Sequence, residues 1–177
     1  MVNVSNRVTR TIRIERHIDD ILKTESQKQN QSVNSIIEQT LLKSIYYNKY
    51  YLKHQIQCIN PTELDTLLTN MSEPEIITAG ENAGNTRAKD TLQTLEIDPD
   101  FNSFKWFIMT ILSKYSGWFT SSYYITDKTH VFLLNHKLSK KWSIFLKSYL
   151  ESMAANILDI DIEATITDKS INLKIPI

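Results

Sequence analysis

The side chains with the clearest chemical potential near the start of the chain are Thr9, Thr11 and Arg13, which stand at every second position. In a β-strand, alternate side chains project from the same face, so these three would share one face of a strand over residues 9–15. An arginine guanidinium can donate two hydrogen bonds to guanine O6 and N7, and a threonine can hydrogen bond to a base or contact a thymine methyl group. This face therefore offers the chemistry of recognising base edges in the DNA major groove.

Ile12 and Ile14 lie on the opposite face, and they fix the orientation of the strand because they have to be buried. A lone strand of this length cannot fold by itself, since its backbone N–H and C=O groups need a partner. The simplest partner is the same strand of a second copy of the chain. We therefore predict a homodimer in which the two strands pair antiparallel into a ribbon that fits the major groove.

Two amphipathic helices follow the predicted strand, one over residues 16–28 and one beginning at Val33. Asn30 stands in the turn between them, and asparagine adopts the left-handed conformation more readily than most residues do. Ser32 is placed to cap the second helix, so the backbone amides of Val33 and Asn34 point out of its N-terminus. Such a helix N-terminus can hold a DNA phosphate, and we predict phosphate contacts at these three residues.

The order of one strand and two helices resembles the ribbon-helix-helix regulators of the Arc and MetJ class. In that family the three outward side chains of the strand read bases, which the resemblance places at Thr9, Thr11 and Arg13. Arg10 stands where the family usually has an apolar residue, and we expect it, like Arg7, to contact DNA phosphate. The resemblance is confined to this N-terminal module.

Two other structures are compatible with the same stretch. A helix-turn-helix would use residues 16–28 and 33–45, but it leaves the alternating strand unexplained. An ordinary strand-helix-helix fragment with a basic surface is the other, and it gives no reason for the strand, the turn, the helix lengths and the charge to agree.

The 177 residues carry no net charge, yet the charged residues are distributed unevenly. Residues 1–54 hold nine Lys and Arg against five Asp and Glu, residues 55–101 hold two against nine, and residues 102–177 hold nine against six. Phosphate binding depends on the local field within a Debye length of about 8–10 Å. We therefore predict a basic DNA-binding and dimerisation module, an acidic helical linker and a separate C-terminal domain over these three ranges.

The linker contains its own helix signals. Asn60 precedes Pro61 as a cap precedes the first residue of a helix, and Ser72 is placed to cap a further helix. Residues 78–100 are polar and include two glycines. We interpret that stretch as a linker or a loosely packed helix.

The C-terminal domain has the pattern of an α+β fold. Apolar residues recur at helical spacing up to Gly117, and a second helix is expected from a cap at Ser139 to Leu158. Each helix precedes a pair of strand candidates, which are residues 119–126 and 130–135, and then residues 161–167 and 171–177. The order helix-strand-strand-helix-strand-strand predicts an antiparallel sheet covered by two helices.

Several functional classes find no support in the sequence. The first residues lack the apolar run of a signal peptide, no window is apolar enough to span a membrane, and Cys58 is the only cysteine, so we expect a soluble cytoplasmic protein. No nucleophile-base pair, glycine-rich phosphate loop or paired carboxylates indicate an enzyme or a cofactor. His130 and His136 invite comparison with metal-sensing regulators, but the dense histidine and cysteine cluster of those proteins is missing, so no metal site is predicted.

We expect a homodimeric, sequence-specific regulator of transcription that binds double-stranded DNA and acts as a repressor. Its C-terminal domain would assemble dimers into a tetramer, bind a small-molecule effector or contact a partner protein. One alternative is an antitoxin whose C-terminal part binds a partner protein. The other is a protein-interaction or ligand-binding protein that does not bind DNA.

Overall fold

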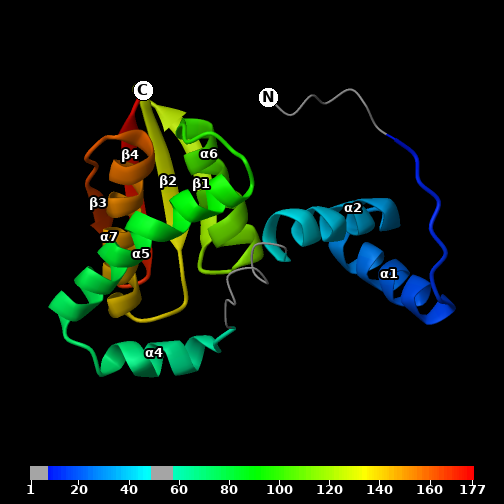
Figure 1. Cartoon of the computed structure of the whole chain (residues 1–177). Helices are drawn as coiled ribbons and strands as arrows, with labels where there is room; N and C mark the ends of the chain where they lie inside the picture. The colour runs from blue at the N-terminus through cyan, green and yellow to red at the C-terminus, as the bar shows by residue number, and fades with distance from the viewer. Residues whose placement is uncertain (1–7, 49–57) are drawn as a thin grey trace. The chain divides into compact units, whose positions relative to one another are not determined.

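The computed structural model describes residues 8–48 and 58–177 and is of mixed α+β class (Figure 1). The chain divides into two compact units, one ending at Ile45 and one beginning at Tyr46. The second unit therefore includes the whole range, residues 55–101, that was predicted to be a linker. Each unit is described by itself.

The N-terminal unit consists of two helices, α1 (Arg16–Gln29) and α2 (Val33–Lys43), and α2 runs on into a short π-helical segment, η1 (Ser44–Asn48). The predicted helix starts are confirmed. Residues 8–15 form neither helix nor strand, and the first strand in the described residues begins at Thr120. A strand exists only through hydrogen bonds to a neighbouring strand, and residues 8–15 pair with none of the described strands of their own chain.

The C-terminal part confirms the predicted order of elements. The two helical segments before the first hairpin are α6 (Phe101–Trp106) and η2 (Phe107–Tyr115), a π-helical continuation of α6. The remaining elements in chain order are β1 (Thr120–Thr126), β2 (Thr129–Asn135), α7 (Lys140–Leu158), β3 (Ala164–Ile166) and β4 (Ser170–Pro176). The strands form one antiparallel sheet in the order β1-β2-β4-β3.

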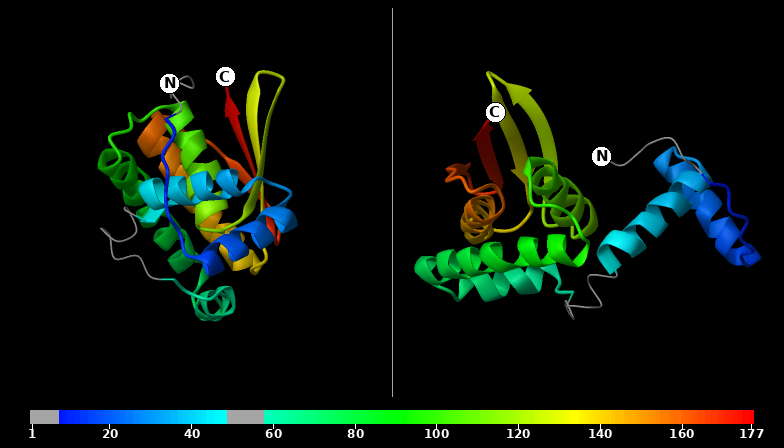
Figure 2. Two further views of the ribbon diagram at one scale, coloured as in Figure 1. Left: turned by 90° about the vertical axis from the view of Figure 1, so that its right-hand side faces the viewer. Right: turned by 45° about the horizontal axis from the view of Figure 1, so that its top comes forward.

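The helices of this unit lie on one face of the sheet, as the view turned by 90° shows (Figure 2). Burial along β4 follows from that arrangement: Ile171, Leu173 and Ile175 are buried, whereas Asn172 and Lys174 between them are not. Adjacent side chains of a strand point to opposite faces, so only the face that meets the helices becomes apolar core. Tyr149 of α7 lies in this core with no exposed surface.

For residues 78–100, a helix is confirmed, whereas the linker and the loose packing are not. These residues lie largely within one continuous helix, α5 (Glu73–Thr94), which packs along α7 and is preceded by α4 (Pro61–Thr69). The small residues Gly80, Gly84 and Ala88 are all buried and recur at every fourth position. Residues with this spacing share one helix face, so α5 presents a stripe without bulky side chains to α7. The scarcity of large apolar residues therefore reflects close helix packing rather than a loose segment.

The predicted caps are confirmed, and so is the break between the strand candidates at residues 119–126 and 130–135. The Asn60 side chain accepts a hydrogen bond from the Thr62 amide at 2.9 Å, and Ser72 and Glu75 form a capping box at the start of α5. Asp127 and Lys128, between β1 and β2, both have positive φ, at 47° and 58°. This is the conformation of a type I′ turn, which joins two strands directly. None of the described helices is long and apolar enough to cross a membrane.

Candidate DNA-binding interface

The turn between α1 and α2 is built from backbone hydrogen bonds. Asn30 has φ 51° and ψ 45°, in the left-handed region that its position was predicted to require. Its amide donates to the Gln27 carbonyl at 3.2 Å, and the Gln31 amide donates to the Ser26 carbonyl at 3.0 Å. These two bonds are the Schellman motif, which ends a helix sharply and turns the chain back. The turn therefore fixes the position at which α2 begins.

Ser32 caps α2 as predicted. Its hydroxyl oxygen accepts a hydrogen bond from the Ser35 amide at 3.1 Å. The amides of Val33 and Asn34 are the first two of the helix, and the helix offers them no carbonyl acceptor. These amides and the positive end of the helix dipole form an N-terminus suited to an anion, and all three residues lie at the surface or only partly below it.

The three predicted base-reading side chains lie in residues 8–15, which have no regular secondary structure and directly precede α1. Thr9, Thr11 and Arg13 are all exposed, and so is Arg10. Arg7, a predicted phosphate contact, lies outside the described residues. The segment ends at Glu15, which occupies the N-cap position of α1 in an extended conformation, with φ −69° and ψ 149°. The structure thus places the candidate base-reading side chains at the surface, without pairing residues 8–15 into a ribbon.

The apolar side chains of the N-terminal unit are exposed as well. Ile12 and Ile14, which the ribbon should bury, have 59% and 42% of their surface exposed. The helices add Ile18, Ile21, Leu41 and Leu42 to the exposed set. No residue in either helix is buried. A unit this small with no buried residue in either helix has no closed core of its own, and its apolar side chains remain open to a further chain segment.

Charged side chains of the unit divide into paired and unpaired groups. Within α1, Lys23 pairs with Asp19 and Lys28 pairs with Glu25, both one turn apart. The hydrogen bond to Asp19 raises the pKa of Lys23. The arginines Arg10, Arg13 and Arg16 form no ion pair with any described residue. Unpaired guanidinium groups are the ones available for phosphate or for guanine.

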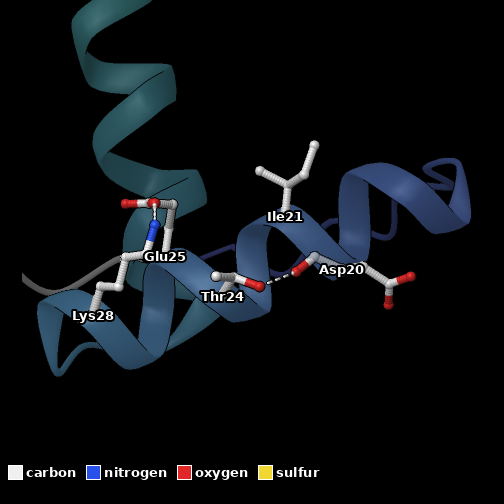
Figure 3. A pocket seen from close by; sticks show the side chains of 5 residues that line it. All are labelled: Asp20, Ile21, Thr24, Glu25 and Lys28. Carbon is white, nitrogen blue, oxygen red and sulfur yellow. Dashed lines mark hydrogen bonds and ion pairs between the residues drawn. The ribbon is translucent and has the colours of Figure 1, made fainter.

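A shallow hollow runs along one side of α1, and Figure 3 shows the five side chains that line it. Thr24 donates a hydrogen bond to the Asp20 carbonyl at 2.9 Å, and Lys28 lies 3.0 Å from a Glu25 carboxylate oxygen. Ile21 projects from the same side with 56% of its surface exposed. The Thr24 hydroxyl and the Lys28 ammonium have partners within α1, so the hollow offers a partner the exposed Ile21 side chain and the Asp20 carboxylate.

The histidines considered for a metal site are held by different neighbours. His130 Nδ1 lies 2.7 Å from the Tyr123 hydroxyl, and the Phe101 ring stacks on the imidazole at 3.8 Å. His136 lies past the end of β2, where its Nε2 is 2.7 Å from the Ser143 hydroxyl. Burial lowers the pKa of both histidines. No three histidine, cysteine, aspartate or glutamate residues within the described ranges are grouped closely enough to hold a metal ion.

A lysine and an aspartate that sequence reasoning left without a role connect α4 to α7. The Lys141 ammonium donates to the Thr69 and Met71 carbonyls, at 2.9 and 2.6 Å, at the C-terminal end of α4. Asp65 of α4 in turn accepts a hydrogen bond from the Ser139 amide at the start of α7, at 3.0 Å. Lys141 is therefore a structural residue, and its position at a helix C-terminus satisfies carbonyls that the helix leaves free.

Comparison with family models, with curated proteins and with solved structures returns no match to this chain. The residues and their geometry are therefore the only guide to its function. The N-terminal unit is the strongest candidate for a functional surface, because it combines unpaired arginines, a capped helix N-terminus and apolar side chains that lack cover.

Proposed function

We propose that two copies of the chain associate through their N-terminal units and bind double-stranded DNA as a sequence-specific transcriptional repressor. The observation that carries the proposal is the exposure of every apolar residue that the ribbon should bury. Pairing of residues 9–15 with another strand, packed against the helices, would cover Ile12 and Ile14. A second copy supplies that strand and covers its own isoleucines in the same way.

Pairing of the two segments would also orient the polar side chains. With Ile12 and Ile14 toward the helices, Thr9, Thr11 and Arg13 project from the opposite face of each strand. A two-stranded antiparallel ribbon is narrow enough for the major groove, where these side chains would meet base edges. The outward Arg13 side chains supply the strongest base contact, a pair of hydrogen bonds from each guanidinium to guanine.

The N-terminus of α2 would fix the ribbon on the DNA without reading the sequence. Ser32 already uses its hydroxyl to cap the helix, so the amides of Val33 and Asn34 remain for a phosphate oxygen. Arg7 and Arg10 would add phosphate contacts near the start of the ribbon. The twofold axis of the dimer requires an inverted repeat in the DNA, and repression requires only that the repeat lie where polymerase or an activator must bind.

The proposal is tested by selecting duplexes from a random DNA pool with the full-length protein at low salt. The parent protein should enrich a short inverted repeat, and Arg13→Ala should enrich none. Lys23→Ala is the matched control, because it removes a positive charge from the same unit at a residue that is paired with Asp19. This control should enrich the same repeat as the parent. Loss of the repeat in both variants, or in neither, contradicts base reading by Arg13.

The same purified protein also distinguishes the two alternatives, an antitoxin and a protein-interaction module that does not bind DNA. An antitoxin of this class would have a C-terminal part that folds on binding its partner, and the packed core around Tyr149 and Leu150 gives that alternative no support. A protein-interaction module that does not bind DNA would dimerise like the parent but enrich no duplex. The duplex selection therefore decides between a DNA-binding and a purely protein-binding dimer.

A further inference from the structure

The outer strand β1 of the C-terminal sheet has backbone groups that pair with nothing in the described chain. Thr126 and Thr129 flank the two-residue turn, and such a hairpin closes with a hydrogen-bonded pair. Alternation along the ladder then directs the N–H and C=O groups of Ser121, Tyr123 and Ile125 away from β2. Within the described ranges these three residues make no backbone hydrogen bond outside the ladder. Pro176 supports the alternation, since it pairs with Thr129, whose own groups face β1.

The two edges of the sheet differ in how they are protected. On the far side, β3 has only three residues, and β4 continues beyond it through Lys174 to Pro176. Short strands, lysine and proline are the features that keep exposed edges from pairing with other chains. β1 has seven residues, Thr120–Thr126, and contains no charge, no proline and no glycine. Only β1 is therefore a full-length edge open to a further strand.

Two large side chains of β1 are also left exposed in the absence of a neighbouring strand. Tyr124 and Ile125 have 45% and 56% of their surface exposed, on opposite faces of the strand. The turn end of the β1–β2 hairpin extends past the helices that cover the sheet (Figure 2). A strand added beside β1 would cover both residues at once, because it would carry side chains on both faces of the sheet.

We propose that β1 pairs antiparallel with β1 of a second copy, which joins the two sheets into one. Tyr123 is the middle residue of the seven, so a twofold axis there places it opposite Tyr123 of the partner subunit. Ser121 then lies opposite Ile125 of the partner subunit, and all the outward backbone groups of both strands are satisfied. The interface belongs to the C-terminal unit and does not depend on DNA binding by the N-terminal unit.

The strand suits a copy of itself better than an unrelated strand. Antiparallel pairing about Tyr123 places Ser122 opposite Tyr124 of the partner subunit, so a small side chain meets a large one in both symmetric pairs. No charges of like sign face each other, because the strand carries none. The same edge has room for a strand of another protein instead. If two copies of this chain do not associate through β1 in solution, that other partner is indicated and the proposal is overturned.

The register is tested by disulfide formation in the full-length protein. Ser122 and Tyr124 are exposed, and in this register they form pairs that are not hydrogen-bonded, with Cα atoms about 4.5 Å apart, close enough for a disulfide. The double variant Ser122→Cys/Tyr124→Cys, made in a Cys58→Ser background, should become a covalent dimer under mild oxidation. The single variant Ser122→Cys should remain uncrosslinked, since the two introduced thiols would be offset by two residues, with Cα atoms roughly 7–8 Å apart, too far for an unstrained disulfide. Absence of the dimer in a folded double variant, or equal cross-linking of both variants, overturns the pairing.

Charge pairing at the same positions provides an independent test that does not need a covalent bond. Ser122→Lys/Tyr124→Lys places lysines directly opposite each other across the interface, and Ser122→Glu/Tyr124→Lys places opposite charges there instead. Sedimentation equilibrium of the full-length variants should show roughly tenfold weaker association for the first than for the second. Any association through the N-terminal units is common to both, so the difference reports the β1 contact alone. Equal association of the two variants overturns the proposal.

Discussion

Gly80 of α5 lies so close to Phe145 of α7 that a Cβ atom added to it would stand 2.6 Å from the Phe145 carbonyl oxygen. The same position would lie 2.9 Å from the Ser148 Cβ atom. One turn later, Gly84 meets the Tyr149 carbonyl in the same manner. The side chains of Ser152 and Asn156 donate to carbonyl groups of α5, so hydrogen bonds accompany the close backbone approach. At Gly80 and Gly84 the two helices are therefore in contact through their backbones.

A glycine-to-alanine substitution usually stabilises a helix, but this close approach predicts that it destabilises the protein at Gly80. Gly80→Ala should lower the free energy of unfolding by about 1–3 kcal/mol, because the added methyl group overlaps backbone atoms of α7 that cannot move independently. Asn82→Ala, on the exposed side of the same helix, should change it by less than about 0.5 kcal/mol. Urea unfolding followed by circular dichroism measures both values. A neutral or stabilising Gly80→Ala would mean that α5 does not approach α7 this closely.

Arg13 should control sequence preference without controlling assembly. Arg13→Ala is expected to reduce the difference in binding free energy between the selected repeat and unrelated DNA by roughly 1–3 kcal/mol for each guanine that the arginine recognises. The dimer should persist, since Arg13 is exposed and takes no part in an ion pair with the described residues. Titration of both duplexes at fixed salt, together with sedimentation, measures the two properties. Unchanged discrimination would exclude Arg13 from base reading.

Ser32 should affect all DNA sequences alike. Ser32→Ala removes the acceptor for the Ser35 amide and should destabilise the start of α2 by about 0.5–2 kcal/mol. The frayed N-terminus then holds a phosphate less well, so affinity for the repeat and for unrelated DNA should fall by a similar factor. Ser32→Asn retains a capping acceptor and should bind as the parent does. A selective loss for the repeat alone would place Ser32 among the base-reading residues instead.

His136 should make stability depend on pH in the mildly acidic range. Burial lowers its pKa below the usual value of 6.5, and this outweighs the raising effects of a backbone hydrogen bond at Leu138 and of Asp65. As pH falls through 6.5, the unfolded chain therefore binds a proton before the folded protein does, and stability decreases until the pH passes below the folded-state pKa. His136→Gln should reduce this slope, which cannot exceed about 1.4 kcal/mol per pH unit for one proton.

The measurement is the free energy of unfolding at several pH values between about 5 and 8, for the parent and for His136→Gln. His130 has a pKa lowered by burial as well, so a residual slope of the same sign should remain in the variant. His130→Gln combined with His136→Gln should flatten the profile further. Identical profiles for the parent and the double variant would contradict the assignment of the slope to these histidines.

Local sequence signals predicted most element boundaries correctly. Ser32, Asn60 and Ser139 occupy the cap positions assigned to them, and Asn30 has the left-handed conformation expected from its place in the turn. The Asp127–Lys128 turn formed without the glycine that usually follows in such hairpins. These features depend on interactions within a few residues, so the chain encodes them wherever it folds.

The features that the sequence did not predict depend on packing between segments that are distant in the chain. Residues 78–100 were interpreted as a linker or a loosely packed helix because glycines and polar residues lower helix propensity, yet close packing against α7 requires small residues at Gly80 and Gly84. A regular spacing of four between the glycines and Ala88 was the available signal. No local signal indicates a role for Lys141, and only the position of α4 shows that its ammonium binds the Thr69 and Met71 carbonyls at the end of that helix.

The sequence alone determined the helix starts and caps, the hairpin turn and the order of elements over residues 102–177, because those depend on short-range hydrogen bonding and on the periodicity of apolar residues. The tertiary structure decided which face of α5 is buried, which lysine is structural and which sheet edge is left open, since each depends on a surface that another element supplies. Residues 8–15 likewise depend on a surface supplied by another element, which in the proposed dimer belongs to a second copy of the chain. The alternation in the sequence defines two faces, and a strand can form there only when another strand satisfies its backbone groups.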